Sequence, residues 1–85
     1  MTTPASGKTA LVTGGNRGLG LETCRQLHHL GYAVILTGRN HADAAAAAKA
    51  IGVEFEPLDV TDRGSIATLA GSLKAQARRV DVLVN

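Results

Sequence analysis

The sequence has few of the residues on which surfaces for nucleic acids and membranes depend. Only two of its 85 residues are aromatic, Tyr32 and Phe55, and none is tryptophan, so we expect an aliphatic core. The basic residues are scattered, and their nearest approach to a run is the pair Arg78 and Arg79. Few aromatics and no basic stripe argue against a nucleic-acid partner. No apolar run approaches the length of a membrane span.

Cysteine is almost absent as well. The single Cys24 excludes an internal disulfide, which suits a reducing compartment. The polar N-terminal stretch MTTPASGK does not resemble a targeting signal. We therefore expect a soluble, cytoplasmic protein whose residues form one small domain or part of one.

Glycine is abundant, and it marks the points at which the hydrophobic period changes. The pattern predicts strands at 8–13, 32–37, 53–58 and 80–84, and helices at 17–30, 41–50 and 61–79. Gly31 and Gly52 are expected to end the first two helices. Four strands alternating with three helices predict an α/β fold, a Rossmann-like doubly wound parallel sheet with strand order 3-2-1-4. The chain would stop after the fourth strand, as the N-terminal half of a single domain with no second domain.

The stretch TALVTGGNRGLGLETC, from Thr9 to Cys24, places four glycines within seven residues where the first strand meets the first helix. Glycine costs backbone entropy on folding, so this density needs a reason. A helix N-terminus can hold a pyrophosphate if the backbone comes close enough. Gly14 would permit the tight turn, Gly18 the close approach of phosphates, and Gly20 close packing of the helix on the sheet. The alternative is a tight turn with no ligand.

These glycines are spaced as TGxxxGxG, and this spacing resembles that of the short-chain dehydrogenase/reductase family. Two later motifs agree in order. LDV, from Leu58 to Val60, resembles the family's adenine contact through the Asp59 carboxylate, and VDVLVN resembles the approach to its Asn-Asn-Ala-Gly motif. Asp59 could instead belong to a turn, with Thr61 or Asp62 capping the third helix. The resemblance implies cofactor contacts at Gly14, Asn16, Arg17, Gly18, Leu19, Gly20, Arg39, Asp59, Val60 and Asn85.

The charged residues near the end of the second strand indicate whether NAD(H) or NADP(H) is the expected cofactor. An NAD site places a carboxylate near the end of the second strand, where it binds the adenine ribose. The stretch LTGRN, from Leu36 to Asn40, contains no acid and offers Arg39, while Arg17 lies in the glycine loop. Two guanidinium groups there would clamp a 2'-phosphate, so we expect NADP(H). Taken singly, either arginine could be a solvated surface residue.

The resemblance implies hydride transfer between NADPH and a small-molecule carbonyl or alcohol, with a Ser and a YxxxK motif as the acid–base groups. None can be located: Tyr32 is followed four residues later by Leu36. We expect the chain to be inactive alone and the full-length protein, which could form oligomers, to carry the catalytic residues. A non-catalytic dinucleotide-binding or interaction module remains the alternative. Epimerisation or dehydration chemistry is disfavoured, because those relatives usually carry TGxxGxxG.

The remaining candidates for chemistry are assigned structural roles. Cys24 is expected to pack within its helix, and Asp81 to be solvated at the start of the last strand. No metal site is expected, because the histidines lack ligand spacing and are interpreted as surface residues: His28, His29 and His41. The last strand would be an exposed edge, so we expect the isolated chain to be marginally stable or to aggregate.

Overall fold

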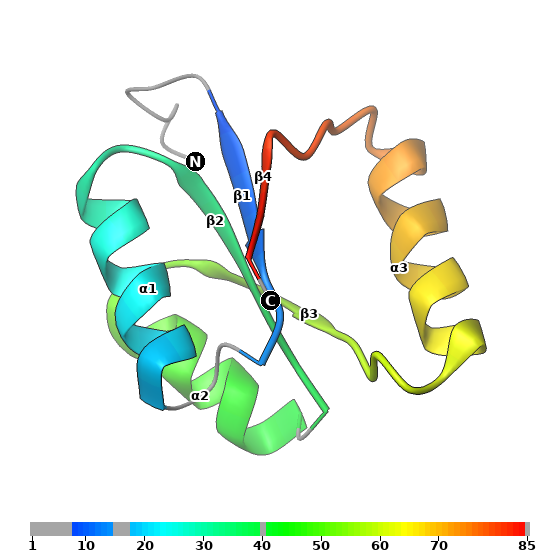
Figure 1. Cartoon of the computed structure of the whole chain (residues 1–85), viewed down its shortest axis with the longest axis horizontal. Helices are drawn as coiled ribbons and strands as arrows, with labels where there is room; N and C mark the ends of the chain where they lie inside the picture. Colours follow the sequence, from blue (N-terminus) through cyan, green and yellow to red (C-terminus); the bar gives the residue numbers. More distant parts are fainter. Residues whose placement is uncertain (1–7, 15–17, 40, 85) are drawn as a thin grey trace.

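The chain folds into one parallel sheet with helices on both faces (Figure 1). The computed structural model describes residues 8–14, 18–39 and 41–84. The elements in chain order are β1 (Thr9–Val12), α1 (Gly18–His29), β2 (Ala33–Gly38), α2 (His41–Ile51), β3 (Glu54–Pro57), α3 (Arg63–Ala75) and β4 (Val82–Val84).

The strand order is β3-β2-β1-β4, and every pairing is parallel. This confirms the predicted α/β doubly wound arrangement. In the centre, Val12 is in register with Leu36 of β2 on one side and with Val84 of β4 on the other. Because all four strands run the same way, their carboxyl ends meet at one edge of the sheet.

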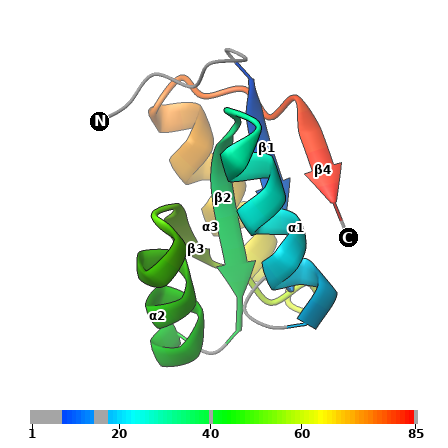
Figure 2. The ribbon, with the colours of Figure 1, turned by 90° about the vertical axis from the view of Figure 1, so that its left-hand side faces the viewer.

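Each face of the sheet has its own apolar core. α1 and α2 cover one face and α3 covers the other (Figures 1 and 2). Neighbouring strand residues alternate between them: Val12, Val34 and Leu36 pack in the cluster with α1 and α2, whereas Leu11 and Ile35 pack with Leu69 of α3. The unbroken apolar run of β2 is thus explained, since both of its faces are buried.

Glycine ends the first two helices as predicted. Gly31 and Gly52 have φ of +95° and +80°, a conformation that glycine adopts without steric cost. The prediction for α3 was wrong at its end, because the helix stops at Ala75 and not at residue 79.

The end of α3 has the same left-handed geometry without a glycine. Ala77 has a φ of +54°, and its N–H donates to the Lys74 carbonyl. The Arg78 N–H donates to the Leu73 carbonyl at 3.0 Å, which completes a Schellman motif. With alanine at this position, the sequence lacked the signal that marked the other two helix ends.

Two aspartates hold the α3 and β4 region in place. Asp62 caps α3, accepting a hydrogen bond from the Gly64 N–H at 2.9 Å, as one of the two expected caps. Asp81 is not merely solvated, contrary to expectation: its carboxylate accepts from the Thr9 N–H at 2.9 Å and from Arg79. These hydrogen bonds, with that from Thr9 the largest cause, hold the pKa of Asp81 below its usual value. Asp81 therefore links the starts of β1 and β4.

Among the described strands, β4 pairs only with β1, so its other side is an edge. Leu83 on this strand is 61% exposed. Within the described residues, no helix is both long enough and apolar enough to cross a membrane.

Ala77→Gly should stabilise the protein by about 0.5–1 kcal/mol. Glycine adopts the left-handed conformation without the steric cost that alanine has, but it loses more backbone entropy on folding, which cancels part of this gain. Chemical denaturation monitored by circular dichroism measures the change. Ala70→Gly, at an exposed position in the middle of the same helix, is the matched control and should destabilise by up to about 1 kcal/mol. A loss of stability in Ala77→Gly comparable to that of the control would contradict the Schellman assignment.

Candidate functional site

The expected site residues that the structure describes gather at the carboxyl edge of the sheet. Gly14 follows β1, Arg39 follows β2, and Asp59 lies just beyond β3. The arrowheads of β1, β2 and β4 point downward in Figure 2, toward the end of the molecule at which α1 begins. Segments that are far apart in sequence are thus brought to one side of the molecule. Three expected contacts, Asn16, Arg17 and Asn85, lie outside the described residues.

The two described glycines that flank the turn before α1 share an unusual backbone conformation and open surroundings. Gly14 and Gly18 both have a φ of +62°, which other residues rarely adopt. A Cβ built on either glycine would meet nothing within 4 Å, so packing inside the protein does not require glycine there. The backbone conformation does require it, and the space at each of these two Cβ positions is open.

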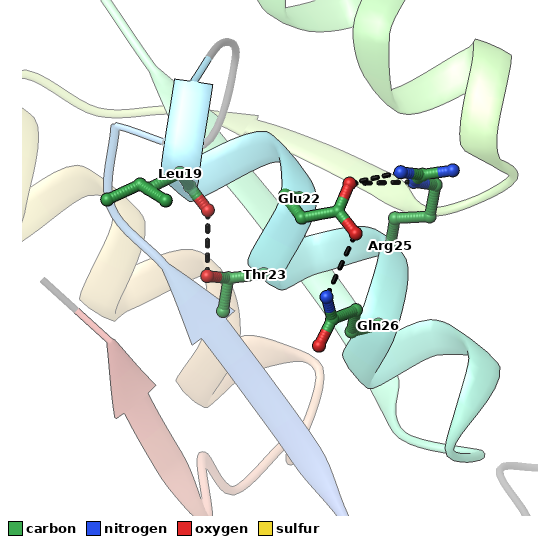
Figure 3. Close-up of polar contacts among 5 residues, drawn as sticks. All are labelled: Leu19, Glu22, Thr23, Arg25 and Gln26. Atoms are coloured by element: carbon green, nitrogen blue, oxygen red, sulfur yellow. Dashed lines mark hydrogen bonds and ion pairs between the residues drawn. The ribbon is translucent and has the colours of Figure 1, made fainter.

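α1 begins at Gly18 and has no acidic residue in its first turn. Its unpaired N–H groups and the positive end of its dipole therefore lie at the edge without a carboxylate from that turn to oppose an anion. Gly20 is half-buried on the same turn, whereas Leu19 is 87% exposed. Figure 3 shows Leu19 and Glu22 pointing to different sides of the helix.

Polar contacts along α1 keep its one carboxylate engaged (Figure 3). Glu22 accepts hydrogen bonds from Arg25 and, at 2.9 Å, from Gln26. These contacts, with that from Arg25 the largest, hold the pKa of Glu22 below its usual value. Thr23 donates to the Leu19 carbonyl at 2.8 Å. Glu22 is thus partly neutralised by neighbours on its own helix.

Hydrogen bonds from two threonines link the end of β1 to the neighbouring strands β2 and β4. The Thr13 N–H donates to the Val84 carbonyl at 2.8 Å, with its hydroxyl 3.2 Å from the same oxygen. Thr37 is fully buried, and its hydroxyl donates to the Val12 carbonyl at 2.7 Å. Sequence reasoning missed Thr37. The available signal was a single hydroxyl at the end of an otherwise apolar strand.

Arg39 is exposed directly after β2. Its charge is near enough to Asp59 to be one of the causes that lower the pKa of that carboxyl. Between Leu36 and Arg39 there is no acid. The ends of β2 and β3 therefore place a guanidinium within electrostatic range of a carboxylate.

Asp59 forms a turn, as the alternative interpretation expected. Its Oδ1 accepts hydrogen bonds from the Thr61 N–H at 2.9 Å and from the Thr61 hydroxyl at 2.6 Å. The hydrogen bond from the Thr61 side chain is the largest cause that keeps the Asp59 pKa below its usual value. Val60 next to it is 58% exposed. The turn interpretation does not exclude an adenine contact, because both bonds fall on one carboxylate oxygen.

Cys24 is a packed core residue, as predicted. It is fully buried in the cluster between the sheet and the helices α1 and α2, and burial raises the pKa of its thiol to about 11. A thiol with that pKa is almost entirely protonated at neutral pH and is a poor nucleophile.

The described histidines and acids form no metal centre. His28 and His29 are exposed, in agreement with prediction, and the side chain of His41 lies outside what is described. In residues 8–14, 18–39 and 41–84, no three His, Cys, Asp or Glu side chains are grouped so that they could hold a metal ion.

Comparison with known proteins identifies the class. Residues 8–85 match the family described as short chain dehydrogenase, and the chain belongs to this family. It is 42% identical over 85 residues to (-)-isopiperitenone reductase of Mentha piperita, across 89% of this chain and 27% of that protein.

Solved structures agree in fold. Menthone neomenthol reductase from Mentha piperita has a TM-score of 0.87 at 34% identity, over 92% of this chain and 30% of its own. The Pseudomonas aeruginosa RhlG/NADP active-site complex has a TM-score of 0.88 at 30% identity, over 98% of this chain and 35% of its own. The chain thus spans about a third or less of the length of these relatives.

Gly18→Ala should weaken dinucleotide binding by tenfold or more, on the order of 1.4 kcal/mol, because the methyl group enters the free space at the turn. It should also cost stability of about 1–2 kcal/mol through the positive φ. Isothermal titration with NADPH measures the first effect and chemical denaturation the second.

Gly71→Ala is the matched control, since a Cβ on this α3 glycine also meets nothing within 4 Å. It should leave binding unchanged and stabilise the helix by about 1 kcal/mol. Unchanged binding in Gly18→Ala would show that the turn is structural only.

Proposed function

We propose that this chain is the NADP(H)-binding first half of a single Rossmann domain in an oxidoreductase that transfers hydride between NADPH and a carbonyl or alcohol. The observation that carries the proposal is the open glycine turn at the N-terminus of α1. A turn with two positive φ values and free space at both Cβ positions suits a ligand that must approach the backbone.

The described residues fit the parts of a dinucleotide. The first turn of α1, with Gly18, Leu19 and Gly20, offers backbone N–H groups for a pyrophosphate. Asp59 and Val60 lie at the end of β3, where an adenine ring would be held between the carboxylate and an exposed apolar side chain. When bound, the nicotinamide would supply the hydride, and the chain's own residues would bind and orient the dinucleotide.

The preference for NADP(H) over NAD(H) rests on charge after β2. Arg39 is exposed there, and no carboxylate between Leu36 and Arg39 would repel a 2'-phosphate. The assigned role of Arg17, in the glycine loop, is part of the same proposal. The solved relative in complex with NADP supports this choice of cofactor.

The enzymatic part of the proposal rests on the relatives. Two of the relatives named above, (-)-isopiperitenone reductase and menthone neomenthol reductase, are reductases, and each is about three times as long as this chain or longer. The described tyrosine, Tyr32, is not followed by a lysine four residues later, and the described cysteine, Cys24, is buried with a raised pKa. The acid–base groups for hydride transfer would therefore come from the part of the protein that these residues do not include.

Arg39→Asp should remove the preference for NADPH. We expect the unaltered protein to bind NADPH about tenfold or more tightly than NADH, because a guanidinium pairs with the 2'-phosphate and an aspartate repels it. Nicotinamide fluorescence measures both dissociation constants, in the longest folded chain that carries these residues.

Lys49→Asp is the matched control, with the same change of charge in the last turn of α2, at the opposite edge of the sheet. It should leave the ratio of the two constants unchanged. Equal binding of both nucleotides would contradict the choice of NADP(H), and binding of neither by a folded chain would contradict the proposal as a whole. NADPH binding by a whole protein that reduces no carbonyl would favour the non-catalytic module.

A further inference from the structure

Asp59 is held in place through both its backbone and its side chain. Its N–H donates to the Ser65 hydroxyl at 2.8 Å, and its carbonyl accepts from the Asp62 N–H at 3.0 Å. Its Oδ1 accepts from the N–H and the hydroxyl of Thr61. A short exposed turn with this many internal hydrogen bonds presents its carboxylate in one orientation.

Both hydrogen bonds from Thr61 are accepted by the same oxygen of the Asp59 carboxylate. A carboxylate oxygen has about two lone-pair sites, and Thr61 engages Oδ1 twice, at 2.9 Å and 2.6 Å. A ligand's donor would therefore meet Oδ2. Since the Thr61 hydroxyl donates its only proton to Oδ1, it also fixes the rotation of the carboxylate about its side-chain bond.

The charge around the turn keeps the carboxylate an acceptor. Asp59 has its pKa lowered first by the Thr61 side chain, then by the Thr61 backbone, and also by the charge of Arg39. It is therefore ionised at neutral pH and has no proton to donate. An ionised carboxylate attracts an amino group on a base and repels a carbonyl oxygen at the same position.

We propose that Thr61 is a positioning residue that aims Asp59 Oδ2 at the base of the dinucleotide and so makes the site select adenine over hypoxanthine. The inference rests on the proposed function, because it requires a dinucleotide at this edge of the sheet. Adenine carries an exocyclic amino group where hypoxanthine carries a carbonyl oxygen. The selection depends on the orientation of the carboxylate, and Thr61 supplies that orientation.

The test compares NADPH with its reduced hypoxanthine analogue, which differs only in that group of the base. We expect the unaltered protein to bind NADPH about tenfold or more tightly than the analogue, as a hydrogen bond to a charged group provides. Thr61→Val removes the hydroxyl but keeps the shape and the N–H, and should reduce this ratio several-fold. Thr61→Ser restores the hydroxyl and should restore the ratio.

Two further variants separate positioning from folding. Thr68→Val is the matched control, because the Thr68 hydroxyl donates to the Gly64 carbonyl within α3 and does not contact Asp59. It should leave the ratio unchanged. Asp59→Asn offers an amide that can donate as well as accept, and should shift the preference toward the analogue.

The outcomes distinguish this inference from the proposed function. A ratio unchanged by Thr61→Val, lost equally in Thr61→Ser, or unchanged by Asp59→Asn overturns the role of Thr61. Equal binding of NADPH and its analogue by the unaltered protein also overturns it, while the proposed function stands. If the folded protein binds neither nucleotide, the proposed function fails and the inference fails with it.

Discussion

The rest of the structure depends on the parallel pairing of β1 with strands on both of its sides. β1 is four residues long, yet it pairs with β2 and β4 and divides its side chains between two cores. Leu11 faces the α3 side and Val12 the side of α1 and α2. Its last carbonyl accepts from the buried Thr37 hydroxyl. The glycine turn that follows therefore starts from a strand that is paired on both sides and packed on both faces.

This constraint determines what can be built at the carboxyl edge. Because the strands are parallel and in register, the turn after β1, the arginine after β2 and the aspartate after β3 reach the same edge of the sheet. Groups that attract anions and a group that attracts donors lie at different places along this edge. The start of α1 and Arg39 favour phosphate groups, whereas the Asp59 carboxylate favours a donor. A ligand with phosphates at its centre and an amino-bearing base at one end satisfies all of these groups together.

The sequence predicted the elements of the fold well because its signals were local. Period changes and glycines located every helix and strand, and Gly31 and Gly52 ended their helices as expected. The end of α3 was missed because Ala77 adopts a positive φ that its sequence does not signal. The shorter helix depends on hydrogen bonds that reach back to Leu73 and Lys74.

Contacts between distant segments were harder to predict. Asp81 was expected to be solvated, but parallel pairing places it beside the Thr9 N–H, 72 residues earlier in the chain. Thr37 was missed for the same reason, since its partner is the carbonyl of Val12 on another strand. At the site, Asp59 was singled out from its motif, whereas the orientation of its carboxylate by Thr61 became visible only in three dimensions.

A crystal structure of the protein with bound NADPH tests the central claim most directly. The account predicts the pyrophosphate against the backbone N–H groups of Gly18 and Leu19, the 2'-phosphate beside Arg39, and the adenine amino group at Asp59 Oδ2. A dinucleotide bound elsewhere, or one with its phosphates away from the start of α1, would contradict it.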